Sequence, residues 1–113
     1  MFPIVAFSTI INYEAADVLT LFPFLKLKYF IFQLWVAYAP CGSQHKDAVQ
    51  ITLEQIDLIK RFIEQYSGNF QYVTSAEGLV EAHKIGKIAS VISVESGHSI
   101  GTSLAVLRMY YRY

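Results

Sequence analysis

Glu95 is the residue of this chain that is best placed for chemistry. It ends an apolar, β-branched run at Ile88–Val94, and a Gly-His-Ser turn follows at 97–99. In a parallel α/β sheet, ligand-binding groups are presented at the carboxyl ends of the strands. A carboxylate in that place can act as a metal ligand or a general base, or it can cap a helix or pair with a loop. Position alone leaves these alternatives open.

His98 follows Glu95 by three residues, a spacing that lets two side chains share a ligand cluster on a helix. Gly97 lies between them and predicts a turn instead, so we expect His98 to be a local hydrogen-bonding residue. The stretch from Gly97 to Ser103 could also present backbone N–H groups to an anion. The glycine-rich nucleotide-binding patterns are absent from the sequence, and a tight βα loop is the simpler interpretation.

The remaining candidates carry weaker signals. His45 and His83 each precede a lysine in polar surroundings, where solvent exposure is the default, and we assign them no role. Cys41 is the only cysteine, which excludes an internal disulfide and a cysteine-rich zinc site and by itself indicates a buried structural thiol. The sequence supports no Ser-His-Asp or Cys-His arrangement.

The amino-acid composition indicates a folded protein with an apolar core and no net charge. Hydrophobic residues make up 54% of the 113 residues and charged residues 16%, which is enough apolar surface for a core and argues against disorder. Nine basic and nine acidic residues give a net charge of zero, and no basic run exceeds Lys60-Arg61. We therefore expect no nucleic-acid binding.

Strand and helix patterns alternate from Leu34 onward. Apolar residues recur at steps of three and four in the first helix, and the expected buried face comprises Val49, Leu53, Ile56, Ile59, Ile63 and Tyr66. Thr74 or Ser75 can cap the second helix, and Ser99 or Thr102 the third. The expected elements are strand Leu34–Ala39, helix 47–66, strand Phe70–Val73, helix Ala76–Ile85, strand Ile88–Val94 and helix Leu104–Tyr111. This alternation predicts an α/β fold with a parallel sheet and helices packed outside it.

Residues 1–32 are harder to interpret. From Val18 to Val36 the composition approaches that of a membrane span, but Pro23 and two lysines lie inside it, and each central lysine costs ~3 kcal/mol in hydrocarbon. An irregular or strand-like apolar stretch is the simpler prediction. The alternative is a membrane-associated segment.

Several motifs occur in a recognisable order between about residue 33 and residue 112: Trp35–Cys41, Lys46–Val49, Thr52–Gln55, Tyr72–Ser75 and Val94–Ile100. Through these motifs the chain resembles the membrane dipeptidase family, also called renal dipeptidases. The resemblance implies a zinc-dependent hydrolase of dipeptides on a (β/α)8 barrel, of which residues 33–113 would form about three βα units, while residues 1–32 do not match.

The same resemblance implies a metal site. Family members hold two zinc ions with a shared carboxylate, which corresponds to Glu95, while a bridging hydroxide attacks the peptide carbonyl. They also carry a His-x-Asp pair at the end of the first strand, and this sequence contains none. Their other zinc-binding histidines and substrate-binding residues lie beyond residue 113. We therefore expect an incomplete, inactive fragment that does not hold zinc alone, and we assign no catalytic or substrate-binding residue.

For a complete member, the resemblance implies a dipeptide substrate, a lipid (GPI) anchor on the extracellular face of the plasma membrane, and a disulfide between Cys41 and a later cysteine. The resemblance allows a homodimer but does not fix the oligomeric state. A rival hypothesis is a non-catalytic membrane-associated or interaction module that uses the apolar residues 1–36 as an anchor. A third is a phosphate-binding module built on the Gly97–Ser103 loop.

Overall fold

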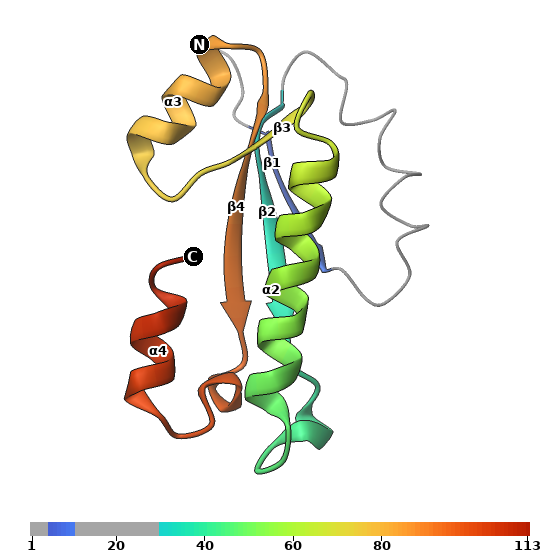
Figure 1. The fold of residues 1–113 in the computed structure, drawn as a ribbon, viewed down its shortest axis with the longest axis vertical. Coiled ribbons are helices and arrows are strands. Elements are labelled where there is room, and N and C mark those ends of the chain that lie inside the picture. Colours follow the sequence, from blue (N-terminus) through green and yellow to red (C-terminus); the bar gives the residue numbers. More distant parts are fainter. Residues whose placement is uncertain (1–4, 11–29) are drawn as a thin grey trace.

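The fold is one parallel sheet with helices packed against it (Figure 1). The computed structural model describes residues 5–10 and 30–113. The strands are β1 (Val5–Ile10), β2 (Phe30–Tyr38), β3 (Phe70–Tyr72) and β4 (Ile88–Glu95), and their order in the sheet is β1-β2-β4-β3. All neighbouring pairs are parallel, which confirms the predicted sheet.

Three helices follow strands β2, β3 and β4, so the three expected βα units are present. They are α2 (Ala48–Gln65), α3 (Ala76–Lys84) and α4 (Leu104–Tyr110), and short 3-10 turns, η1 (Cys41–Ser43) and η2 (Gly97–Ile100), precede α2 and α4. Figure 1 shows α2 lying along the sheet, with α3 near the start of β4 and α4 near its end.

The first third of the chain contributes more to the sheet than the sequence pattern indicated. Strand β2 begins at Phe30 rather than Leu34, and β1 pairs with it from Val5 to Ile10. Phe30–Val36, the end of the apolar segment considered for a membrane role, is thus part of a sheet strand. The rest of that segment, 18–29, lies outside the described residues.

The two faces of the sheet pack against different helices. Trp35 is the register partner of Ile92, and both belong to the core that α2 covers together with Phe70. The next residues along the strands point the other way, as the two-residue period of a strand requires. On that face Ala89 packs in a smaller cluster with Ala82 of α3.

The buried face of α2 contains polar residues and so differs from the predicted one. Leu53 was expected inside and is 42% exposed, whereas Thr52 is fully buried and Gln55 is 8% exposed. Polar partners explain the difference: the Thr52 hydroxyl donates to the Ala48 carbonyl at 2.8 Å, and Gln55 Oε1 accepts the Tyr38 N–H at 2.5 Å. Apolar periodicity does not register such bonds: one lies within α2 itself, and the other depends on the neighbouring strand β2.

Helix caps were predicted with partial success. Ser75 Oγ accepts the Gly78 N–H at 3.1 Å and caps α3 as expected. Helix α4 is capped by Ser103, whose Oγ accepts the Val106 N–H at 3.3 Å, so the choice of Ser99 or Thr102 was wrong. Ser99 instead lies buried in η2, where its hydroxyl donates to the Ser96 carbonyl at 2.6 Å.

Candidate active site

Glu95 lies at the carboxyl end of β4, where the sequence placed it. It is exposed, and its register partner on β2 is Tyr38. Because side chains alternate along a strand, Glu95 is on the face opposite Ile92 and Val94, away from α2. A carboxylate at the carboxyl end of a parallel strand is in the position where barrel enzymes present their functional groups.

Tyr38 is held beside Glu95 by main-chain and side-chain contacts. Its amide is fixed by Gln55 of α2, and its hydroxyl forms a hydrogen bond with Cys41. The charge of the Cys41 thiolate raises the pKa of Tyr38 above its usual value, and burial, the hydrogen bond to Cys41 and the charge of Glu95 act in the same direction. The phenol therefore stays protonated, as a hydrogen-bond donor, to a higher pH than a free tyrosine.

Replacing Cys41 tests this electrostatic coupling. Cys41→Ala removes the largest contribution, so the pKa of Tyr38 is expected to fall toward the ordinary tyrosine value of about 10. The measurement is an alkaline absorbance titration of tyrosinate, taken as the difference between each protein and its Tyr38→Phe counterpart. An unchanged difference curve would show that the thiol does not act on Tyr38.

The position of Cys41 corrects the sequence-based expectation. A buried thiol was predicted, but Cys41 is exposed. The η1 turn directs Ser43 inward instead, where Ser43 is 4% exposed and its hydroxyl donates to the Pro40 carbonyl at 2.6 Å. Composition alone cannot tell which residue of a tight turn is buried, so it could not show that Ser43 rather than Cys41 faces inward.

His98 joins the two loops that follow β2 and β4. Its Nε2 lies 2.9 Å from the Ala39 carbonyl and 3.1 Å from the Pro40 carbonyl, so Nε2 carries the proton and donates. The predicted hydrogen-bonding role is confirmed, but the partners are on another strand's loop rather than local. His45 and His83 are exposed, as predicted.

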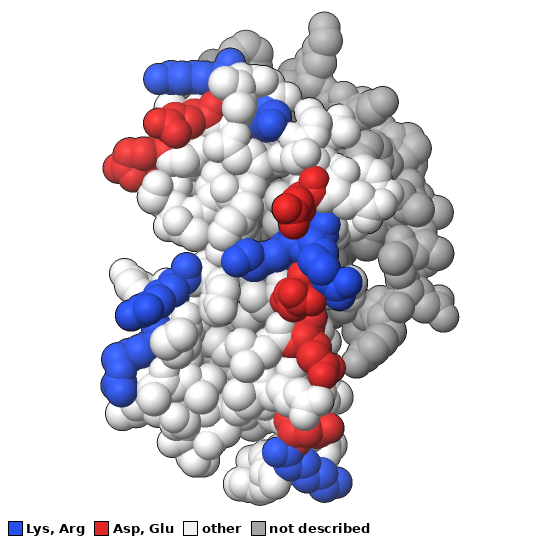
Figure 2. All heavy atoms as spheres, in the orientation of Figure 1, with Lys and Arg blue, Asp and Glu red and all other residues white. Residues whose placement is uncertain are grey.

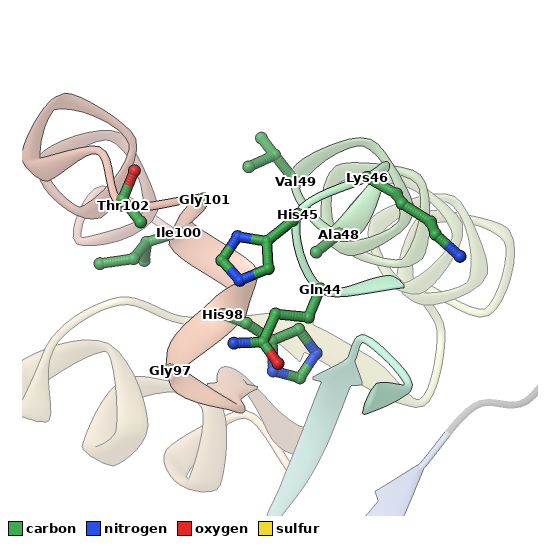
Figure 3. A pocket seen from close by; sticks show the side chains of 10 residues that line it. All are labelled: Gln44, His45, Lys46, Ala48, Val49, Gly97, His98, Ile100, Gly101 and Thr102. Carbon is green, nitrogen blue, oxygen red and sulfur yellow. The ribbon is translucent and has the colours of Figure 1, made fainter. Parts of the chain in front are cut away.

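A pocket of about 590 Å³ opens between these loops and the start of α2 (Figure 3). His45, to which the sequence assigned no role, lies at its centre in Figure 3, and Gln44 lies beside it. Among the described residues, the non-glycine positions with positive φ are His45, Ser96 and Thr102, all in these two loops. No sequence pattern announces the pocket, because it arises from loops that the sheet brings together across more than 50 residues.

The described residues alone do not form a zinc centre. They contain no group of three or more His, Cys, Asp or Glu side chains close enough to share a metal ion. A catalytic zinc takes three protein ligands and a water, whereas Glu95 is one carboxylate. Also within the described part of the chain, no helix is long and apolar enough to cross a membrane.

Comparisons with known proteins agree with this geometry. A model of the membrane dipeptidase family (peptidase family M19) matches residues 13–113, and so begins before the expected boundary at residue 33. Dipeptidase 3 of Mus musculus is 52% identical over 79 residues, and Dipeptidase 3 of Homo sapiens is 49% identical over 79 residues. Each alignment covers 70% of this chain and 15% of the relative.

A solved structure shows the same fold at low sequence identity. An amidohydrolase from Pseudomonas aeruginosa superposes with a TM-score of 0.75 at 14% identity, over 96% of this chain and 31% of that chain. The chain thus forms part of a (β/α)8-type barrel, and it spans about 15% of the length of the curated relatives it matches. With a family match that extends over residues 13–113, this chain belongs to the membrane dipeptidase family.

Proposed function

We propose that this chain contributes to a zinc-dependent dipeptidase site, and that Glu95 is the carboxylate that bridges its two metal ions. The observation that carries the proposal is the place of Glu95: an exposed acid at the carboxyl end of a barrel-type strand, on the face away from α2. Membership of the family supports dipeptide hydrolysis as the reaction.

The chemistry of a carboxylate suits that role. Its two oxygens can each coordinate one cation, and a metal pair in such a site supplies a hydroxide and polarises the peptide carbonyl. The adjacent Tyr38 remains a neutral phenol and brings no second negative charge to the carboxylate.

We further propose that the 113-residue chain does not hydrolyse dipeptides by itself. One carboxylate among the described residues is fewer than the three protein ligands that a catalytic zinc needs. The other ligands would come from other parts of a whole family member. Sustained zinc-dependent cleavage of a dipeptide by the purified chain, abolished by a chelator, would contradict this.

The role of Glu95 is best tested in a complete barrel. Residues 33–113 would replace the matching segment of an active, full-length family member, and dipeptide hydrolysis and bound zinc would be measured. Glu95→Gln is expected to lower kcat/KM by at least about 100-fold and to reduce the zinc content, because even residues that only orient metal ligands contribute 10–100-fold.

Glu64→Gln is the matched control, since Glu64 is an exposed carboxylate on α2, far along the helix from its first turn. It should leave both readouts unchanged. A Glu95→Gln chimera that keeps its full zinc content and its activity would remove Glu95 from the metal site.

We propose that membrane attachment and a disulfide apply to the whole protein as they do in the family. The exposure of Cys41 supports the disulfide, because an accessible thiol can reach a cysteine elsewhere in the protein. Peptide mapping of the non-reduced chimera would identify its partner. Attachment by a lipid anchor at the extracellular face would be read from release of the whole protein by a lipid-cleaving phospholipase.

A further inference from the structure

The turn that follows Glu95 begins with a residue in an unusual conformation. Ser96, which joins β4 to η2, has φ 75° and ψ 120°. A positive φ brings the Cβ atom of an L-residue too close to the backbone, so glycine is the usual residue in such a place. A serine keeps this conformation only where the surrounding structure holds it there.

Ser99 makes the contacts that hold Ser96. The Ser99 hydroxyl donates to the Ser96 carbonyl at 2.6 Å, and the Ser99 main-chain N–H donates to the same oxygen at 3.0 Å. Ser99 is 1% exposed, so these bonds are strong ones, formed away from water. The Ser99 carbonyl accepts the hydroxyl of the buried Tyr110 at 2.9 Å, which ties η2 to α4. The residue that fixes Ser96 is thus itself fixed.

The turn after β2 shows which part of this arrangement is special. There Ser43 makes the same pair of bonds to the Pro40 carbonyl, at 2.6 Å from its hydroxyl and at 2.9 Å from its N–H, and Ser43 is also buried. Pro40, however, has φ −62° and ψ 151°, an ordinary extended conformation. The two turns share their hydrogen bonds, but of the two only the turn after Glu95 uses them to hold a residue at positive φ.

The bonds that hold the turn after Glu95 join neutral groups. In Figure 2 the charged side chains gather on α2, on α3 and on the outer side of α4. The ion pair between Arg61 and Asp57 lies on α2, where both side chains are exposed. Salt screens exposed charges and has little effect on buried contacts between neutral groups. The hold on the turn should therefore not depend on ionic strength.

We propose that Ser99 is a positioning residue for Glu95: by holding Ser96 at positive φ, its hydroxyl sets the direction of the Glu95 carboxylate. Strand β4 is fixed by its pairing with β2, and η2 is fixed by Tyr110, so a change at Ser96 is taken up at the junction, where Glu95 lies. A metal-bridging carboxylate must be placed within about 0.5 Å, and supporting hydrogen bonds provide that accuracy. The inference rests on the proposed role of Glu95 as the bridging ligand.

The test uses the full-length chimera, with the zinc dissociation constant and kcat as readouts. Ser99→Ala is expected to weaken zinc binding by about 10–100-fold, the usual effect of losing a group that orients a metal ligand, and to do so equally at low and high salt. Ser43→Ala is the matched control, because it removes the same bond from the turn after β2. It should leave zinc binding unchanged, and circular dichroism of the metal-free proteins would verify that both variants are folded.

Ser96→Gly separates positioning from a general structural role of Ser99. Glycine adopts a positive φ without strain, so less depends on the Ser99 hydroxyl once glycine is at position 96. Ser99→Ala should then cost less zinc affinity in the Ser96→Gly chimera than in the parent. Equal losses in the two backgrounds would overturn the proposal. So would a Ser99→Ala chimera with unchanged zinc affinity, or a Ser43→Ala chimera that is weakened as much.

Glu95→Gln, measured in parallel, distinguishes failure of this proposal from failure of the proposed function. If Glu95→Gln lowers the zinc content and Ser99→Ala does not, Glu95 remains a metal ligand and only the role of Ser99 is overturned. If neither substitution affects zinc, both proposals fail. If Ser99→Ala weakens zinc binding and Glu95→Gln does not, Ser99 does not act through Glu95, and both proposals fail again.

Discussion

Trp35→Ala is expected to remove most of the stability of the chain. Trp35 is 1% exposed, and its ring lies 5.3 Å from Phe62 and 5.7 Å from Phe70, centroid to centroid. Replacing such a side chain by alanine costs about 3–5 kcal/mol, because apolar contacts are lost and a cavity remains. Whole domains are stable by only about 5–15 kcal/mol. The loss would therefore be comparable with the total.

Urea denaturation followed by far-ultraviolet circular dichroism measures this effect, since the substitution removes the only tryptophan and its fluorescence. Trp35→Phe is the matched variant. The indole Nε1 is buried without a hydrogen-bond partner in the described part of the chain, so phenylalanine gives up no hydrogen bond and keeps most of the packing. It is expected to cost less than about 2 kcal/mol. Equal losses for the two variants would show that ring packing is not what Trp35 contributes.

Gly101→Ala is expected to destabilise the junction between the η2 loop and α2. Gly101 has φ +55°, and a Cβ added there would lie 2.8 Å from Cγ2 of Val49. The left-handed conformation costs alanine about 1–2 kcal/mol, and forcing a carbon against a β-branched side chain in a helix adds about 1–3 kcal/mol. We expect a total loss of about 2–5 kcal/mol in the free energy of unfolding.

Two other glycines separate the contributions. Gly86 has φ +74° but nothing within 4 Å of an added Cβ, so Gly86→Ala should show the conformational cost alone. Gly42 has neither a positive φ nor a close neighbour, and Gly42→Ala should be nearly neutral. Adding Val49→Ala to Gly101→Ala should lessen the contact cost. If Gly101→Ala and Gly86→Ala cost the same, close approach to Val49 is unimportant.

The sequence was sufficient for the elements from residue 34 onward because local signals agreed there. Helix α2 has an apolar period, a polar opposite side and a Ser-Gly-Asn stop, and it was found within one residue at each end. The strand leading to Glu95 was found because β-branched residues run into a single acid. The family resemblance rests on the same stretches, and the family match confirms it.

Other features were decided by contacts between distant segments. Tyr38 and Glu95 became neighbours through the register of β2 and β4. Gln55 faces inward because the Tyr38 amide needs an acceptor there, and His98 donates to carbonyls 58 and 59 residues away. Each of these depends on which strands pair and at what register, which a single sequence does not state.

By itself, then, the sequence determined the alternation of strands and helices, the parallel sheet and the place of Glu95 at a strand end. These follow from local patterns of apolar side chains, turn residues and caps, which act over a few residues. Only the tertiary structure decided that β3 pairs with no more than the first part of β4, that Cys41 is exposed beside Tyr38, and that the face of α4 is left uncovered within the described residues. The physical reason is that burial and hydrogen bonding are settled between segments far apart in the chain, after the local elements have formed.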